Sequence, residues 1–156
     1  MSTPAYHIEP LDPANHRHEA FDCGVEPLNR YLHEQARLDM KRRAAGCWVL
    51  VDAATPWEIL GYYTLSPEVI VAAELPATLA PELAKKIPPY ARLGAYLIGR
   101  FAILRTHQGR KLGHLLFLDA LYRCASLAVP AVFVVDRKST RLNSSHIQKS
   151  RMPSSA

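Results

Sequence analysis

The amino-acid sequence predicts an α/β fold, with a mixed central sheet flanked by helices. Two apolar runs, 47–51 and 59–65, are separated only by a turn and therefore predict an antiparallel hairpin. Further along, the strand-like run 94–104 is followed by helical apolar spacing and then by the apolar strand 131–135. Because a helix connects these last two strands, we expect them to be parallel.

The first third of the chain predicts a loop, a turn and one long helix. Prolines and an asparagine predict the loop over 10–18, and 21–24 is a candidate turn. Helical spacing predicts a helix over 26–43, which ends in Lys41-Arg42-Arg43, where cations suit the helix dipole. The expected core face of this helix consists of Leu28, Tyr31, Leu32, Ala36 and Met40.

The remaining elements lie around a proline-rich stretch and a second helix. Prolines punctuate 67–90, where a short helical piece over 81–86 is predicted, with proline in its first turn. The next helix begins at Leu112. Its expected core face consists of Leu112, Leu115, Leu116, Ala120, Cys124 and Leu127.

The connection between the strand ending at Leu104 and the helix beginning at Leu112 is typical of a phosphate site. It is basic, it contains glycine, and it leads into a helix N-terminus, whose free N–H groups and positive dipole end attract anions. The loop matches neither the dinucleotide nor the nucleotide-triphosphate motif. From spacing alone, an ordinary strand-to-helix turn remains the alternative.

Gln108-Gly109-Arg110-Lys111-Leu112-Gly113 resembles the Q/R-x-x-G-x-G/A signature of the GNAT acetyltransferases. The resemblance implies the GNAT acyl-CoA N-acyltransferase fold, with acetyl-CoA as co-substrate and no metal. It also implies that the loop amides bind the pyrophosphate and that the preceding strand binds the pantetheine arm. The cofactor-binding residues so implied are Phe101, Ala102, Ile103, Gln108, Gly109, Arg110, Lys111, Leu112 and Gly113.

Lys111 departs from the signature, since it stands where the family has glycine. With a negative φ it could donate its N–H at no cost, whereas a positive φ would cost roughly 1 kcal/mol.

A second resemblance, over residues 6–136, is to the GNAT toxins of bacterial toxin–antitoxin modules. It rests on four blocks in the right order: Phe21-Asp22-Cys23-Gly24, Leu28-Asn29 with Tyr31-Leu32, Gly61-Tyr62-Tyr63-Thr64-Leu65-Ser66 and Leu97-Ile98-Gly99-Arg100-Phe101-Ala102-Ile103. It implies acetylation of the amino group of aminoacyl-tRNA, a ribbon-helix-helix antitoxin as partner and, as a further option, a homodimer.

Two other functions stay open: a GNAT enzyme acting on a small-molecule or protein amine, and an inactive fragment that only binds CoA. Tyr62, Ser66 and Glu68 are candidates to line the acceptor side, each with a structural role as the alternative. Lys41-Arg42-Arg43 is either a solvated helix end or, in the toxin interpretation, a contact for the tRNA backbone.

The net charge of +5 lies entirely in the last segment, because residues 1–136 carry 14 basic and 14 acidic side chains. Residues 137–156 are rich in serine and basic residues and show no apolar pattern, which predicts a disordered tail. The run KSTRLNSSH resembles translated sequencing-adapter read-through. We therefore expect a GNAT domain over 1–136 that is truncated, with a non-native tail over 137–156. The tyrosine that protonates the CoA thiolate in GNAT toxins has no counterpart here, so the catalytic residues are unknown.

The remaining composition predicts a cytoplasmic protein without membrane spans. Hydrophobic residues make up 49% of the chain, no apolar run approaches the ~20 residues of a membrane helix, and the N-terminus lacks signal-peptide features. Cys23, Cys47 and Cys124 are expected to be reduced thiols, and Cys124 to lie in the core. His16-Arg17-His18 is expected to be a polar loop rather than a metal site.

Overall fold

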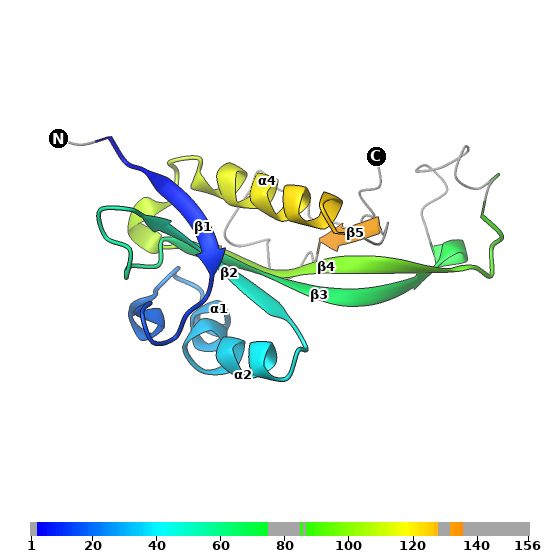
Figure 1. Cartoon of the computed structure of the whole chain (residues 1–156), viewed down its shortest axis with the longest axis horizontal. Helices are drawn as coiled ribbons and strands as arrows, with labels where there is room; N and C mark the ends of the chain where they lie inside the picture. The colour runs from blue at the N-terminus through cyan, green and yellow to red at the C-terminus, as the bar shows by residue number, and fades with distance from the viewer. Residues whose placement is uncertain (1–2, 75–84, 86, 128–131, 136–156) are drawn as a thin grey trace.

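The computed structural model describes residues 3–74, 85, 87–127 and 132–135. Five strands form one sheet in the order β1-β2-β3-β4-β5 (Figure 1). The strands are β1 Tyr6–Pro10, β2 Gly46–Asp52, β3 Gly61–Val71, β4 Arg92–Ile103 and β5 Val132–Val135. The helices are α1 Glu26–Arg30, α2 Ala36–Lys41 and α4 Leu112–Ala125, and the short turns are η1 His18–Ala20, η2 Tyr31–Gln35, η3 Ala72–Glu74 and η5 Arg105–His107.

The sheet is mixed, as the sequence predicted. β1, β2, β3 and β4 pair antiparallel in succession, and β5 pairs parallel with β4. β1 is an element that the sequence reasoning missed. The hairpin strand predicted over 59–65 begins at Gly61 and continues to Val71, well into the segment expected to be irregular. Pro67 is accommodated within β3, opposite Tyr96 of β4.

Helices cover both faces of the sheet (Figure 1). The α1–α2 segment lies on one face, where its apolar side chains meet Val49, Val51, Tyr62 and Ala102 in a first core cluster. α4 lies on the opposite face, where Leu112, Leu116 and Ala120 join a second cluster with side chains from β2, β3 and β4. The sheet therefore separates two cores.

The helix predicted over 26–43 is present as α1 and α2, which are joined by the π turn η2. In this turn the N–H of Ala36 donates to the carbonyl of Tyr31, a bond that spans five residues instead of four. Four of the five expected core residues are buried, and Met40 packs against their cluster. Helical structure ends at Lys41, and Arg43 adopts a positive φ of 58° in the turn that follows.

The predicted core face of α4 was wrong at two positions. Leu115 and Leu127 are 40% and 41% exposed, whereas Leu112, Leu116, Ala120 and Cys124 are buried. The reason is geometric: the buried positions recur every four residues along the sheet side of α4, Leu115 lies beside that row, and Leu127 comes after the end of the helix at Ala125.

The loop over His16-Arg17-His18 buries both of its histidines, which are only 5% and 8% exposed. His16 accepts the N–H of Asp12 at Nδ1, and its Nε2 lies 2.6 Å from Glu9 Oε1. The contact between His16 and Glu9 anchors the loop after β1 to that strand.

The predicted helix over 81–86 and the tail over 137–156 lie outside the described residues. Within the described part, no helix is long and apolar enough to cross a membrane.

Candidate functional site

The site is built around a β-bulge in β4. Tyr63 of β3 pairs with Phe101, but Leu65 pairs with Ile98, so Gly99 and Arg100 together oppose the single residue Thr64. The buried hydroxyl of Thr64 accepts the N–H of Arg100 at 2.9 Å and so satisfies the bulge. A bulge bends its strand and re-aims the side chains beside it.

The described pairing between β4 and β5 ends at the same point, where the described residues of β5 also end, and the edge of β4 beyond it is called the open edge because no described strand pairs with it. The four paired positions of β4 run from Ala95 to Ile98, and none of the described residues pairs with β4 on that side beyond the bulge. The N–H groups of Arg100 and Leu104 both point toward β3, because they donate to Thr64 and to the carbonyl of Leu60. Since successive residues of a strand point to opposite sides, the backbone of Phe101 and Ile103 faces the open edge.

This edge is where the sequence resemblance placed the pantetheine arm. An open strand edge offers N–H and C=O groups to an extended chain of amides, as in strand addition. The side chains of Phe101, Ala102 and Ile103 are buried in the two cores. The backbone of Phe101 and Ile103 is therefore what this edge can offer, since that of Ala102 faces β3 by the same alternation.

The loop after β4 presents a run of free N–H groups. The backbone N–H groups of Gly109, Arg110, Lys111, Leu112 and Gly113 donate to no acceptor within the described residues. The first α4 bond is donated by His114 to the carbonyl of Lys111 at 3.2 Å. Gly109 and Lys111 both have positive φ, of 82° and 61°, which curls the backbone ahead of the helix. Such curled backbone followed by a helix N-terminus is a concave anion-binding arrangement.

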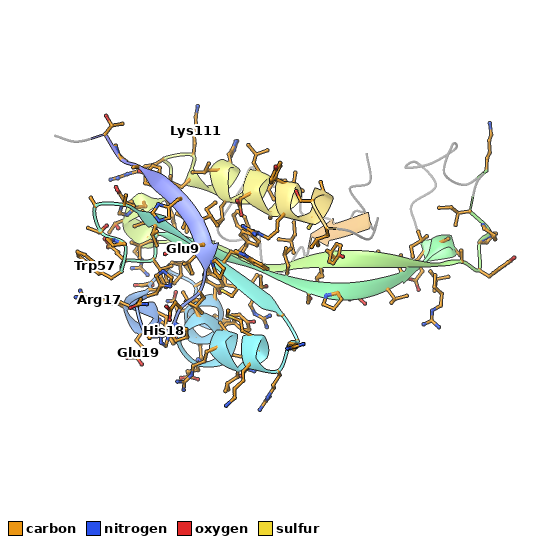
Figure 2. All side chains as sticks on the ribbon, viewed as in Figure 1. Glu9, Arg17, His18, Glu19, Trp57 and Lys111 are labelled. Carbon is orange, nitrogen blue, oxygen red and sulfur yellow. The ribbon has the colours of Figure 1, made fainter. Side chains whose placement is uncertain are left out.

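Lys111 therefore adopts the less favourable of the two conformations considered for it. It caps α4 in the left-handed region, where a residue with a Cβ carries roughly 1 kcal/mol or more of strain. Its side chain is exposed and projects from the head of α4 (Figure 2). The ammonium is therefore free to approach an anion bound in the loop.

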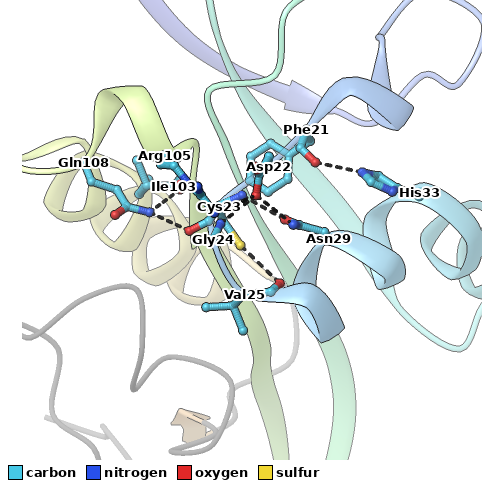
Figure 3. Close-up of polar contacts among 10 residues, drawn as sticks. All are labelled: Phe21, Asp22, Cys23, Gly24, Val25, Asn29, His33, Ile103, Arg105 and Gln108. Carbon is cyan, nitrogen blue, oxygen red and sulfur yellow. Dashed lines mark hydrogen bonds and ion pairs between the residues drawn. The ribbon is translucent and has the colours of Figure 1, made fainter.

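The phosphate-loop candidate is pinned to the turn over 21–24, far away in the sequence (Figure 3). The side-chain amide of Gln108 donates to the carbonyl of Cys23 at 2.8 Å and to that of Ile103 at 2.9 Å. The N–H of Arg105 donates to the carbonyl of Asp22 at 2.8 Å, and its guanidinium lies 3.6 Å from the Asp22 carboxylate. Gln108 thus holds the loop in place through its side chain.

The turn is itself locked by Asn29 of α1. This buried side chain accepts the N–H of Cys23 at 2.8 Å and donates to Asp22 at 2.9 Å (Figure 3). The Asp22 carboxylate also accepts the N–H of Gly24, which has a φ of 88°. These bonds lower the pKa of Asp22, the Gly24 N–H most strongly. The Phe21–Gly24 and Leu28–Asn29 blocks of the sequence are therefore one structural unit beneath the loop.

The acceptor-side candidates differ in their burial. Tyr62 is fully buried, and its hydroxyl donates to the carbonyl of Leu28 at 2.7 Å. Burial raises the pKa of Tyr62 well above its usual value. Its role is therefore structural. Ser66 and Glu68 lie along β3 past the bulge and are half-buried.

All three cysteines are buried and free of disulfides, as expected. In the residues that the structure describes, no group of three His, Cys, Asp or Glu side chains is placed to hold a metal ion.

Comparison with known proteins gives a consistent result, although no family model matches the chain. The chain is 27% identical over 109 residues to the tRNA-acetylating toxin of Mycobacterium tuberculosis, which covers 70% of this chain. It is 27% identical over 123 residues to the probable toxin TacT of Sinorhizobium fredii, which covers 78% of it. The chain spans only 60% and 64% of the lengths of these two relatives.

Solved structures are similar over more of their length. AtaT complexed with acetyl-methionyl-tRNAfMet is 31% identical with a TM-score of 0.72, and the match covers 84% of this chain and 77% of AtaT. A mutant of KacT is 30% identical with a TM-score of 0.74, covering 87% of this chain and 82% of KacT. AtaTR bound with acetyl-CoA is 30% identical with a TM-score of 0.67, covering 84% and 76%. The chain therefore belongs to the toxin-type GNAT acetyltransferases, the family of AtaT and KacT.

Proposed function

We propose that this chain derives from an N-acetyltransferase that moves the acetyl group of acetyl-CoA to the amino group of an aminoacyl-tRNA. The observation that carries the proposal is the run of free N–H groups from Gly109 to Gly113, set directly beyond the open edge of β4. Together they fit a ligand with a pyrophosphate at one end and an amide-containing arm that leads to the bulge. Of Phe101, Ala102 and Ile103, we assign the pantetheine contacts to the backbone of Phe101 and Ile103, since that of Ala102 faces β3.

The chemistry is direct transfer. A neutral amine attacks the thioester carbonyl supplied by the bound acetyl-CoA, and we assign the stabilisation of the developing oxyanion to the N–H of Phe101. Tyr31, Tyr62 and Tyr63 already donate their hydroxyls to Asp39, to the carbonyl of Leu28 and to Asp119. We therefore assign the acid that protonates the thiolate to none of them, and the catalytic residues stay unassigned.

The acceptor and partners follow from the relatives. AtaT has been captured with acetyl-methionyl-tRNAfMet and with the C-terminus of the antitoxin AtaR, and KacTA has been captured with DNA. By analogy we propose an aminoacyl-tRNA acceptor, a cognate antitoxin of the ribbon-helix-helix type, a homodimer and a cytoplasmic location. We further propose that Lys41, Arg42 and Arg43, all exposed, contact the tRNA backbone.

Coenzyme A binding tests the site without requiring turnover. Saturating coenzyme A should raise the melting temperature of the full chain, since a ligand that binds only the native state stabilises it by mass action. Gly113→Glu should remove this shift, because its carboxylate would repel the pyrophosphate from the free N–H groups. Leu118→Glu, at a 62% exposed position on the same helix, is the matched control and should keep the shift. A folded parent chain that shows no shift would overturn the site.

Transfer of labelled acetyl groups then identifies the acceptor. Acetylation of aminoacyl-tRNA supports the main proposal, and acetylation of small amines or protein amines alone supports the second function. Coenzyme A binding without transfer to any acceptor supports the third function, a fragment that only binds CoA.

The domain boundary at 136 has a separate test. We propose that residues 137–156 are not native to this protein. Sequencing of the locus from native DNA should give different codons after Asp136, and recovery of the same codons would refute the proposal.

A further inference from the structure

The bulge in β4 sets the direction of Arg100. Ile98 and Phe101, on either side of the bulge, both join the core cluster under α4. The side chain of Arg100 instead lies over the ring of Tyr31, at the junction of α1 and α2 on the opposite face. Gly99, the other residue of the bulge, has no side chain. A Cβ at this position would come within 3.2 Å of Thr64 Oγ1. The sequence therefore places one cation beside the point where β4 and β5 part.

The charge of Arg100 is not balanced by a carboxylate in the described residues. Its guanidinium carbon lies 3.7 Å from the centroid of the Tyr31 ring, and the side chain is half-buried. No ion pair of Arg100 is present there, whereas Arg105 pairs with Asp22 and Arg123 with Asp119. A guanidinium that lies on an aromatic ring without a carboxylate partner keeps its N–H groups for solvent or for an anionic ligand.

The carboxylate that bonds to the Tyr31 hydroxyl is already engaged. Both oxygens of Asp39 accept hydrogen bonds, one from the Tyr31 hydroxyl at 2.8 Å and one from Gln35 at 2.8 Å. Tyr31 itself stays neutral, because burial and its bond to Asp39 raise its pKa far above the usual value. These bonds fix the ring on which the guanidinium lies, so Arg100 is held rigidly with its N–H groups available.

We propose that Arg100 is a positioning residue that binds the phosphate of the terminal nucleotide of the acceptor. The inference rests on the proposed function, because the aminoacyl ester of a tRNA joins its amine to that phosphate through the ribose of a single nucleotide. A guanidinium binds phosphate through two parallel hydrogen bonds and stacks on an aromatic ring at the same time. Beside the bulge, this contact would fix the amine next to the open edge of β4, where the thioester is expected.

The test uses two small probes and the full chain. One probe is an aminoacyl-adenosine with an amide-linked amino acid, and the other is the same compound with a 5′-phosphate. The parent should bind the phosphorylated probe at least about tenfold more tightly, the effect of one charge-assisted contact. Arg100→Gln should reduce this preference to near unity, and Arg100→Lys should retain part of it.

Arg17→Gln is the matched control. Arg17 also lies over an aromatic ring, 5.6 Å from the centroid of Trp57 (Figure 2). It lines a cavity of about 250 Å³ that does not include Arg100. This variant should keep the full phosphate preference. Unchanged coenzyme A binding by Arg100→Gln would show that the variant is folded and that its cofactor site is intact.

The outcomes separate the inference from the proposed function. If the parent binds both probes equally, or if Arg100→Gln keeps the preference, the role of Arg100 is overturned while the acceptor class stands. If the parent binds neither probe but still binds coenzyme A, the aminoacyl-tRNA acceptor fails, and the role of Arg100 fails with it. Lost coenzyme A binding in Arg100→Gln would instead assign this residue to the cofactor and contradict the proposal.

Discussion

The side-chain amide of Gln108 donates to the carbonyl of Cys23, a residue 85 positions earlier, and to the carbonyl of Ile103. One amide group therefore joins the end of β4, the candidate phosphate loop and the turn that precedes α1. Both carbonyls are acceptors, and the amide group that donates to both holds them close together. A residue that the family signature implies as part of the cofactor site thus also supports the loop from below.

Gln108→Glu should weaken this junction. A carboxylate cannot donate to the two carbonyls, so we expect the free energy of unfolding to fall by about 1–3 kcal/mol. Thr106→Val, at an exposed position of η5, should change it by less than about 0.5 kcal/mol. Urea denaturation measures both, and equal effects in the two variants would contradict a supporting role for Gln108.

Asn29→Ala should be more damaging than its size suggests. It removes the acceptor of the buried Cys23 N–H and a donor to Asp22, and a buried N–H left without a partner costs about 1–3 kcal/mol. Asn15→Ala is the control, since Asn15 is exposed and its side chain bonds only to the exposed Asp12–Asn15 turn. The melting temperatures of the two variants should differ by several degrees. Similar melting temperatures would contradict a stabilising role for the hydrogen bonds of Asn29.

Lys111→Gly should stabilise the protein. Glycine adopts a φ of 61° without steric cost, which relieves about 1 kcal/mol of strain. Lys111→Ala keeps the Cβ, and therefore the strain, while it removes the charge. We expect the glycine variant alone to shift the urea midpoint upward. If alanine raises stability as much as glycine does, charge repulsion rather than backbone strain is the cause.

Asp22 should give the stability a dependence on acidic pH. Its pKa in the folded chain lies below the ordinary value of 3.8, so its contribution is fully present above that value and is lost as the pH falls through the lowered pKa. Asp22→Asn cannot titrate, and it should flatten this part of the curve. Unfolding free energies measured from about pH 7 to about pH 2 test this, and parallel curves for parent and variant would disprove it.

Apolar spacing was enough to predict most of the fold. It predicted the helix over 26–43, which the structure shows from Glu26 to Lys41, and the strand over 47–51, which extends from Gly46 to Asp52. β1 was missed because it is short, ends in a proline and alternates only weakly, so its existence depends on pairing with β2. The length of β3 was missed because Pro67 suggested irregular structure, although long-range pairing with β4 holds it in the sheet.

The site was predictable only in outline. The glycine-containing loop before a helix predicted the place of the free N–H groups. The role of the strand before it was implied only by the family resemblance and stays a prediction. The positive φ of Lys111 could not be read from the sequence, because lysine is disfavoured there. The bond from Gln108 to Cys23 and the position of Arg100 over Tyr31 both depend on how distant elements pack, to which local periodicity is insensitive.

The π turn between α1 and α2 makes the length of this segment as important as its composition. The wide turn holds one residue more than an ordinary helical turn, because the N–H of Ala36 reaches back five residues to Tyr31. Removal of one residue from 32–35 should therefore close the turn to an ordinary one and leave Ala36 and Asp39 on their present faces. Removal of one residue just after the turn, at 37 or 38, would instead rotate Asp39 by about 100° away from the Tyr31 hydroxyl. Since the ring of Tyr31 carries the guanidinium of Arg100, a deletion after the turn should disturb the site, whereas a deletion within the turn should be tolerated.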